Sequence, residues 1–325
     1  MNFEEHAGKP LLAGRGIAVP RGGLAKTPDE AAEIAARIGP VVVKAQAPAG
    51  KRGKAGGIKP AATPDETRTH AEAIIGMEIG GHKVEQVLVE EQMPIERELY
   101  AAVLNDPLSK GPLVMFSTEG GMDIEEVAAT APDQLHRHSV DIRRGFSRAD
   151  AGTLVRGLGL GAAEEKVADA LARLYEVYAA FDAELLEINP LIVTRDGRVV
   201  ALDCKFVMDD SGIVRHPELA RMGTPEKLSS LEARAKAAGL KYIDLDGDVG
   251  VLANGAGLTM TTMDVIRHHG GTHWFLKNNK GKVIDPTAEQ FADSVPYDQG
   301  KGCGFLTREP SKRARELLRR AGFRD

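Results

Sequence analysis

The segment from Leu185 to Lys205 constrains the fold more than any other part of the sequence, because it predicts a β-hairpin whose register can be assigned. Two apolar runs flank a loop, Arg195-Asp196-Gly197. With Gly197 in the left-handed conformation, this three-residue loop would pair Thr194 with Arg198. A two-residue loop would instead shift the register by one residue and change every cross-strand neighbour.

In the three-residue register, four polar side chains of the hairpin fall on one face. Side chains alternate between the two faces of a strand, so Asn189 lies opposite Asp203 and Glu187 lies opposite Lys205. A carboxylate opposite an amide oxygen, with a second carboxylate beside them, suits a hard cation such as Mg²⁺ that also holds phosphate oxygens. An ordinary half-exposed hairpin with one Glu–Lys pair is the alternative.

A second informative segment is a strand that leads into a basic, glycine-rich loop. Lys44 lies in the apolar run Val41–Ala45, and residues 50–57 contain four glycines with Lys51, Arg52 and Lys54. Glycine lets backbone N–H groups approach phosphate oxygens closely, and the cations neutralise phosphate charge. The spacing is not that of a Walker loop, and a solvated surface loop is the alternative. A lysine in an apolar strand usually has an anionic partner, which favours phosphate binding.

Helices and strands alternate along the first 200 residues, which is typical of α/β and α+β proteins. The predicted helices cover residues 28–38, 63–75 and a stretch from 167 to about 181, and the predicted strands cover residues 41–43, 84–90, 98–104, 113–117 and 185–193. Residues 117–121 predict either a substrate-facing turn or a plain Gly-Gly turn. Residues 88–94 predict a strand end that could offer backbone groups to an adenine edge, or a strand end without such a role.

Composition excludes several classes of protein. The 325 residues are 42% hydrophobic and 27% charged, which fits a soluble globular protein of about two domains. No 18 uncharged apolar residues follow one another and the start has no basic segment, so we expect no membrane span and a cytoplasmic location. Cys204 and Cys303 predict neither a disulfide framework nor a structural zinc site. A net charge of −5 and 5% aromatic residues give no sign of nucleic-acid binding.

The C-terminal part of the sequence differs from the rest. Residues 272–325 carry a net charge of +4, against −9 for residues 1–271. The polar, Ala-rich residues 224–238 are the candidate linker, and a strand, glycine turn and helix follow at residues 249–268. Within the tail, Asn278–Gly281 predicts a hairpin turn, and residues from 309 onward predict a basic helix that must dock or fray.

An ordered series of segments resembles the β subunit of the ADP-forming succinate–CoA ligase (succinyl-CoA synthetase) family and its relative malate–CoA ligase. The matching segments are GRGIAVP, VVVKAQAPAGKRGKAGG, VEQVLVEE, ERELY, STEGGMDIEEVA, LLEINPL, ALDCK and DGDVGVLANGAGLTMTTMDVIRHHGG. The resemblance covers residues 1–271. It implies an α+β ATP-grasp domain over residues 1–238, the start of a flavodoxin-like CoA-ligase domain over residues 239–271, and an unrelated tail over residues 272–325.

The resemblance also implies cofactors, a partner and site residues. The cofactors are Mg²⁺ and ATP, the partner is a CoA-ligase α subunit that carries a phosphohistidine, and the substrate is a small acid. By position, the implied site residues are the phosphate-binding Lys44, Lys51, Arg52 and Gly53, the nucleotide-side Glu90, Glu91 and Glu98, the Mg²⁺ ligands Asn189 and Asp203, Glu187 at the phosphohistidine, and Asn254 toward the acid substrate.

Two departures from the family pattern matter for function. The family loop usually reads AGGRGKAGG or AGARGKAGG, whereas Lys51 replaces the small residue here. After Gly271 the family continues through further strands and a second glycine-rich loop that serves the phosphohistidine, and the glycine cluster at residues 300–304 does not lead directly into a comparable helix.

Two functions therefore follow from the sequence. One is the nucleotide-binding β-type subunit of an acid–CoA ligase, with succinate or malate and ATP or GTP left open. The other is a non-catalytic ATP-grasp-like binding protein or chimera. We expect nucleotide binding with little or no ligase turnover.

Overall fold

The computed structural model describes residues 1–122, 124, 131–224 and 228–237, and short pieces beyond them at 252–253, 260–262, 264–265, 276–277, 283–284 and 303–304. The chain divides into two compact units, Met1–Glu226 and Lys227–Asp325. Their boundary falls inside residues 224–238, the segment that the sequence predicts as a linker. Part of that segment, α8 (Ser230–Ala237), is helical.

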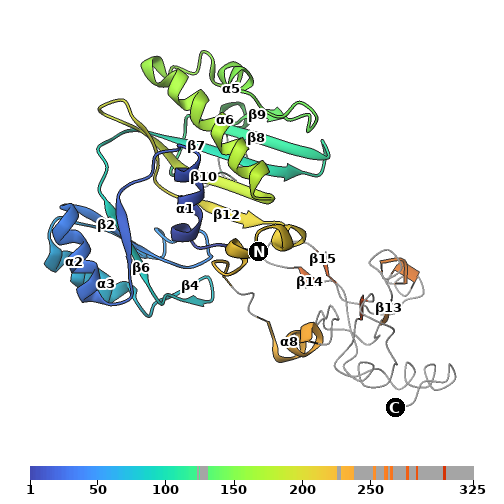
Figure 1. The fold of residues 1–325 in the computed structure, drawn as a ribbon, viewed down its shortest axis with the longest axis horizontal. Helices are drawn as coiled ribbons and strands as arrows, with labels where there is room; N and C mark the ends of the chain where they lie inside the picture. Colours follow the sequence, from blue (N-terminus) through green and yellow to red (C-terminus); the bar gives the residue numbers. More distant parts are fainter. Residues whose placement is uncertain are drawn as a thin grey trace. The chain divides into compact units, whose positions relative to one another are not determined.

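The first unit begins with a helix and a small four-stranded antiparallel sheet (Figure 1). The sheet has the strand order β1-β6-β2-β3, and helices α2 and α3 pack on it. The bounds are α1 Glu5–Gly14, β1 Gly22–Ala25, α2 Pro28–Ile38, β2 Val41–Ala45, β3 Ile58–Ala61, α3 Pro64–Ile74 and β6 Val87–Glu91, with a short hairpin of β4 Glu78–Ile79 and β5 His82–Lys83. Val41, Val43, Val89, Ala71 and Ile74 are among the residues of its core.

Local sequence explains where α2 and α3 begin. Thr27 accepts a hydrogen bond from the N–H of Glu30, whose carboxylate accepts the N–H of Thr27, so the two residues form a capping box. Thr63 caps α3 in the same way through the N–H of Glu66. Both helices confirm the predicted ranges to within one residue.

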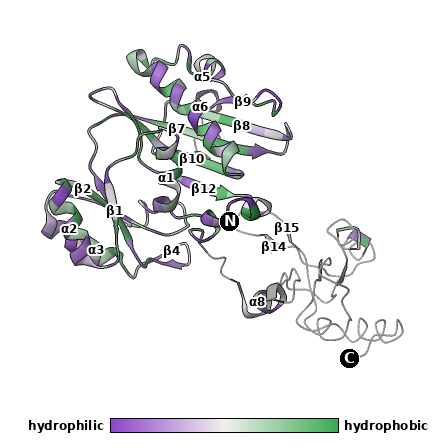
Figure 2. Ribbon diagram, viewed as in Figure 1, coloured by the Kyte–Doolittle hydropathy of each residue, from purple (hydrophilic) through white to green (hydrophobic). Residues whose placement is uncertain are grey.

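The second part of the same unit is a larger antiparallel sheet with the strand order β11-β10-β7-β8-β9, in which β12 also pairs with β10. Helices α5 and α6 cover one face, and α1 packs against both α6 and β12. The bounds are β7 Ile95–Asp106, β8 Gly111–Ser117, β9 His136–Ser139, α5 Arg148–Val155, α6 Glu164–Ala180, β10 Ala183–Thr194, β11 Val199–Ala201, β12 Lys205–Met208 and α7 Pro217–Ala220, with 3₁₀ turns at Pro132–Gln134, Gly161–Ala163 and Asp210–Arg215. Figure 2 shows hydrophobic and hydrophilic residues on different sides of α6, as expected for a helix that packs on a sheet.

The predicted hairpin register is confirmed. Gly197 has a φ of 73°, its N–H donates to the carbonyl of Thr194 at 2.7 Å, and the N–H of Thr194 donates to the carbonyl of Arg198 at 2.9 Å. Leu191 pairs with Ala201 in β11, and Glu187 pairs with Lys205 in β12. Asn189 and Asp203 fall in the break between these two ladders.

The second unit contains two short strand pairs among its described residues. Strands β14 (Leu276–Lys277) and β15 (Val283–Ile284) pair antiparallel, with Leu276 opposite Ile284, which confirms the hairpin predicted for the tail. Strand β13 (Leu252–Ala253) pairs with β16 (Cys303–Gly304). The predicted helix after residue 309 and the glycine turn around Asn254 lie outside the described residues.

Among the described residues, no helix combines the length and apolar character that a membrane crossing requires.

Candidate functional site

Six charged side chains from distant parts of the sequence meet inside the first unit. We call Glu5, Lys9, Lys44, Arg52, Glu90 and Asp203 the charged cluster. In it, Lys9 Nζ lies 2.7 Å from Glu5 Oε1 and 2.6 Å from Glu90 Oε1. Lys44 Nζ lies 2.9 Å from Glu5 Oε1 and 2.8 Å from Glu90 Oε2, and it also donates to the carbonyl of Leu202.

Arg52 connects the basic loop to the hairpin. Its Nη1 donates to the carbonyl of Ala45 at 3.0 Å and lies 2.7 Å from Glu5 Oε2. Its Nη2 donates to Asp203 Oδ1 at 2.7 Å. One guanidinium therefore joins α1, the end of β2 and the hairpin strand break, because its planar fork presents donors in two directions.

The charges of the cluster compensate one another. Three cations face three carboxylates, and all of them are buried except Asp203, whose side chain is 31% exposed. Burial lowers the pKa of Lys44, but the carboxylates of Glu5 and Glu90 outweigh this effect and hold the pKa above its usual range. Burial raises the pKa of Glu5, but the surrounding cations, Lys44 first, hold it well below its usual range. Lys44 and Glu5 therefore stay charged at neutral pH.

The sequence predicted part of this cluster. The anionic partner expected for Lys44 is present, and it is formed by two residues, Glu5 and Glu90. Glu5 and Lys9 were missed. Their one signal is the spacing of four residues, which places them on the same face of a helix, but Pro10 lies inside α1 and argues against a helix there.

The basic loop folds back on the end of β2. Gly57 closes it, since its carbonyl accepts the N–H of Ala45 at 2.7 Å and its N–H donates to the carbonyl of Arg52 at 2.9 Å. A Cβ at Gly57 would lie 2.7 Å from Ile79 Cδ1 and 3.0 Å from Ala45 Cβ, so a larger residue would require Ile79 to shift. Lys51 has a φ of 62°, a left-handed conformation that favours glycine, at the position where this sequence departs from its family pattern.

On the hairpin side, the predicted magnesium ligands make hydrogen bonds within the chain. Asn189 Oδ1 accepts the N–H of Gly121 at 2.8 Å, and its Nδ2 donates to the carbonyl of Met122 at 2.9 Å. The turn at residues 117–121 is capped by Ser117 Oγ, which accepts the N–H of Glu119 at 3.1 Å. This turn is thus a capped glycine turn that also holds Asn189.

Three other predicted residues, Glu187, Glu91 and Glu98, do not belong to the charged cluster. Glu187 Oε2 accepts the hydroxyl of Tyr100 at 3.0 Å. Glu91 follows Glu90 in β6 but faces the other side of the strand, where it pairs with the exposed Arg21 at 2.8 Å. Glu98 is exposed on β7.

The last two predicted residues are Gly53 and Asn254. Gly53 is exposed in the basic loop. Asn254 lies outside the described residues.

The donor set on the hairpin fits magnesium held jointly with phosphates. Among the described residues, no group of three or more His, Cys, Asp or Glu side chains is arranged to hold a metal ion. Mg²⁺ is usually bound through one or two carboxylates together with substrate phosphates, so it does not require such a cage. Asp203 and Asn189 offer that smaller set, and Arg52 Nη2 lies 2.7 Å from Asp203 Oδ1.

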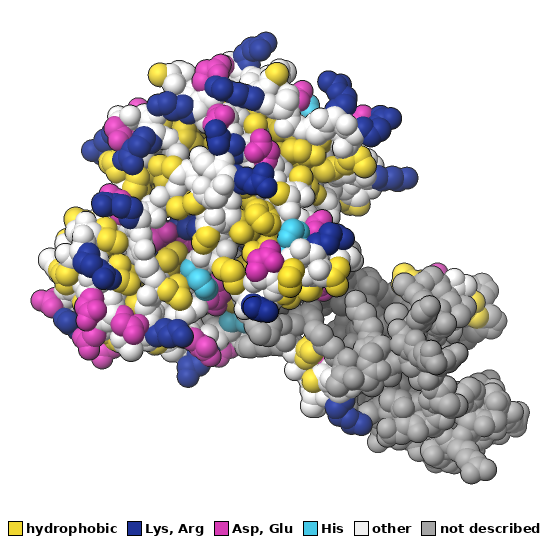
Figure 3. Space-filling model, viewed as in Figure 1, with side chains coloured by type: hydrophobic (Ala, Val, Ile, Leu, Met, Phe, Trp, Pro, Cys, Tyr) yellow, Lys and Arg dark blue, Asp and Glu magenta, His cyan; other side chains and the backbone are white. Residues whose placement is uncertain are grey.

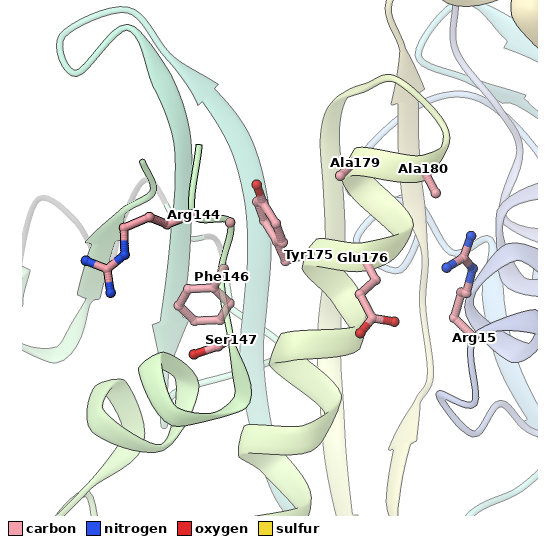
Figure 4. Close-up of a pocket in the computed structure, with 9 residues that line it drawn as sticks. Arg15, Arg144, Phe146, Ser147, Tyr175, Glu176, Ala179 and Ala180 are labelled. Carbon is pink, nitrogen blue, oxygen red and sulfur yellow. The ribbon is translucent and has the colours of Figure 1, made fainter. Parts of the chain in front are cut away.

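A shallow pocket is lined by residues that do not belong to the charged cluster. It measures about 540 Å³ and is lined by Arg15, the stretch from Arg144 to Ser147, and Tyr175, Glu176, Ala179 and Ala180 of α6. Figure 4 shows Tyr175 and Glu176 between Arg144 and Phe146 on one side and Arg15 on the other. None of its lining residues belongs to the charged cluster.

On the face drawn in Figure 3, cationic and anionic side chains of the described residues are interspersed.

Comparison with known proteins gives consistent matches for most of the chain. The family described as ATP-grasp domain matches residues 2–193. The GDP-forming succinate–CoA ligase subunit beta of Thermus thermophilus is 45% identical over 272 residues, which cover 83% of this chain and 72% of the relative. The ADP-forming succinate–CoA ligase subunit beta of Rubrobacter xylanophilus is 46% identical over 273 residues, 83% of this chain and 71% of the relative. The match to the ADP-forming subunit of Nitratiruptor sp., 44% identical, covers 90% of this chain and 77% of that relative, so it extends beyond residue 271.

Solved structures share the fold. ATP citrate lyase from Methanothrix soehngenii, in complex with citrate and coenzyme A, matches with a TM-score of 0.58 and 19% identity over 83% of this chain and 69% of that one. The dinucleotide-forming acetyl-coenzyme A synthetase 1 of Ca. Korarchaeum cryptofilum, in complex with coenzyme A, Ca-AMPCP and HgCl⁺, matches with a TM-score of 0.55 and 24% identity over 64% of this chain and 93% of that one. At such identities the likeness concerns the fold alone, and it agrees with the predicted ATP-grasp architecture.

Proposed function

Because this chain belongs to the family of succinate–CoA ligase β subunits and carries their ATP-grasp domain, we propose that it binds a magnesium–nucleotide complex and uses it in acid–CoA ligation with an α subunit. One observation supports this proposal most strongly. The charged cluster brings Lys44, Arg52 and Asp203 together from three separate elements: Lys44 and Arg52 both contact Glu5, and Arg52 also contacts the part-exposed Asp203.

We assign roles by the chemistry of each group. Lys44 and Arg52 donate to phosphate oxygens, and the backbone around Lys51 and Gly53 approaches the same oxygens. Asp203 and Asn189 hold Mg²⁺, which when bound neutralises phosphate charge. The strand end at Glu90 and Glu91 and the carboxylate of Glu98 lie toward the nucleoside.

The remaining proposed steps involve the partner. A histidine of the α subunit receives the phosphoryl group near Glu187 and passes it to the acid, after which CoA displaces the phosphate. Asn254 contacts the acid, which is succinate or malate. The relatives include both GDP-forming and ADP-forming enzymes, so either nucleotide fits this proposal. Cys204 is a free, buried thiol, which suits a reducing compartment such as the cytoplasm.

The test is reconstitution. The purified chain is mixed with an α subunit of the family, Mg²⁺, CoA, ATP or GTP, and succinate or malate, and acyl-CoA formation is measured. Acyl-CoA formation supports the full proposal and identifies both substrates. A chain that binds neither ATP nor GTP would contradict it.

A second candidate function is nucleotide binding without ligase turnover. The observation that favours it is Lys51, a long cation in a left-handed conformation within the loop that must approach the phosphates. The same reconstitution separates the two functions. Mg-dependent nucleotide binding with little or no acyl-CoA would support the second, which is the outcome that the sequence predicts.

A further inference from the structure

We propose that Arg52 and Asp203 exchange partners when the magnesium–nucleotide complex binds. Arg52 Nη2 passes from the Asp203 carboxylate to a phosphate oxygen, and Asp203 becomes available to the cation. This inference rests on the proposed nucleotide-binding function and adds a second role for Arg52. Before the ligand arrives, Arg52 occupies the place of the cation.

The starting point is the environment of Asp203 in the structure. Among the described residues, both hydrogen bonds to this carboxylate go to Oδ1, one from Arg52 Nη2 at 2.7 Å and one from the N–H of Cys204 at 2.8 Å. A guanidinium and a divalent cation repel each other, so they cannot share Oδ1 closely. Binding of the cation therefore competes with Arg52.

The geometry of Arg52 makes the exchange possible without moving the whole side chain. Nη1 stays anchored, because it donates to the carbonyl of Ala45 at 3.0 Å and lies 2.7 Å from Glu5 Oε2. Only the Nη2 contact, which faces the half-exposed side of the cluster, has to change. The loop backbone is held as well, since the carbonyl of Arg52 accepts the N–H of Gly57 at 2.9 Å.

The charge balance explains why the chain would hold Asp203 in this way. Without a cation, Asp203 next to the buried Glu5 and Glu90 would be an uncompensated carboxylate at the edge of a buried cluster. Arg52 supplies the missing charge. When a cation and an anionic phosphate arrive together, the cation faces Asp203 and Arg52 Nη2 faces the phosphate, so each of these two groups keeps an opposite charge beside it.

This exchange predicts opposite effects of one substitution on two ligands. Arg52→Gln should weaken Mg-ATP binding, because a donor to the phosphate is lost. The same variant should bind Mn²⁺ alone more tightly than the wild type, because the competitor at Asp203 is gone. A residue that only binds phosphate would leave Mn²⁺ affinity unchanged, and one that only maintains the fold would weaken both.

The experiment uses the full chain and two measurements. Mg-ATP affinity is measured by calorimetry, and Mn²⁺ binding without nucleotide is measured from the free-ion signal in electron paramagnetic resonance. Arg68→Gln is the matched control, since it removes the same charge from exposed pairs with Asp29 and Asp65. We expect Arg52→Gln to lower Mg-ATP affinity about tenfold or more and to raise Mn²⁺ affinity about threefold or more, with neither change in the control.

Further variants keep the outcome interpretable. The double variant Arg52→Gln with Asp203→Asn must lose the gain in Mn²⁺ affinity. If circular dichroism shows that Arg52→Gln is unfolded, Arg52→Lys replaces it and must weaken Mg-ATP while binding Mn²⁺ at least as tightly as the wild type.

Unchanged or weaker Mn²⁺ affinity in folded Arg52→Gln, or weaker Mn²⁺ affinity in Arg52→Lys, would overturn the exchange. Failure of the wild type to bind Mg-ATP would instead refute the proposed function, so the two failures are distinguishable.

Discussion

Two ion pairs in the first unit have the same distance between their charged atoms but differ in burial. Lys9 and Glu5 in the charged cluster lie 2.7 Å apart, and Arg68 and Asp65 on α3 also lie 2.7 Å apart. The side chains of the first pair are 5% and 1% exposed, and those of the second are 45% and 91% exposed. Arg68 Nε on α3 also lies 2.8 Å from Asp29 Oδ1 on α2.

Burial gives the two pairs different energetic consequences. Water screens the surface pair, so it contributes little to stability. A buried pair pays a desolvation cost that hydrophobic side chains would avoid, and the loss of one partner leaves an uncompensated charge. Charges kept inside a protein despite this cost often mark a functional site. We therefore propose that the charged cluster is the site.

The largest effect is expected at the carboxylate that we assign to the cation. Asp203→Ala should abolish Mg-dependent nucleotide binding, with an affinity loss of about 100-fold or more, and leave the fold intact. The reason is that phosphate charge would then face Glu187 without a bound cation. Calorimetry with Mg-ATP measures the loss, and Asp65→Ala is the surface control. Unchanged Mg-ATP affinity in folded Asp203→Ala would remove Asp203 from the site.

The next effect is on stability. Lys9→Met removes one of three buried cations and leaves Glu5 and Glu90 with too little compensation, so the free energy of unfolding should fall by about 3–5 kcal/mol. Urea unfolding of this variant and of Arg68→Met provides the comparison. The surface variant should keep the wild-type midpoint. Equal effects of the two substitutions would mean that burial does not distinguish the two pairs.

The third prediction concerns pH. Glu5 faces Lys9 on its own helix, Lys44 on β2 and Arg52 in the basic loop, and these cations hold its pKa well below the ordinary value of 4.5. A lowered pKa adds stability above the ordinary value, and this stability is lost as the pH falls below 4.5 and Glu5 is protonated in the folded state. Urea unfolding across this acidic range should therefore show a decline that is smaller in Glu5→Gln. An identical decline in both proteins would assign it to other carboxylates.

The smallest effect is expected in the basic loop. Lys51→Gly removes the strain of a lysine in the left-handed conformation, which should raise the free energy of unfolding by up to about 1 kcal/mol. The larger conformational entropy that glycine loses on folding reduces this gain. It should also change ATP affinity, in either direction, more than Lys54→Ala does. If both variants bind ATP like the wild type, the side chain of Lys51 has no part in the nucleotide site.

The sequence predicted the fold where a local signal was strong. The left-handed Gly197 determined the loop length, and the loop length determined the register of the whole hairpin. Capping residues such as Thr27 determined where helices begin. Shorter elements such as β1, β3 and β9 were missed, because four-residue strands without alternation carry no periodic signal.

The candidate site was predicted in part, for a related reason. Lys44 stood out because a lysine is unusual in an apolar strand, and its need for an anion followed from that. Which anion compensates it depends on tertiary packing of α1 against β2 and β6, and no local pattern encodes this contact. The pairing of Arg52 with Asp203, which are 151 residues apart, could not be predicted for the same reason.

A crystal structure of the full chain with Mg²⁺ and a non-hydrolysable ATP analogue tests most directly whether the nucleotide binds at the charged cluster. We predict that the terminal phosphates lie within hydrogen-bond distance of Lys44 and Arg52, and that the cation lies on Asp203, with Arg52 Nη2 no longer on that carboxylate. A nucleotide bound elsewhere, for example in the pocket between Arg15 and Arg144, with the charged cluster unchanged, would contradict this claim.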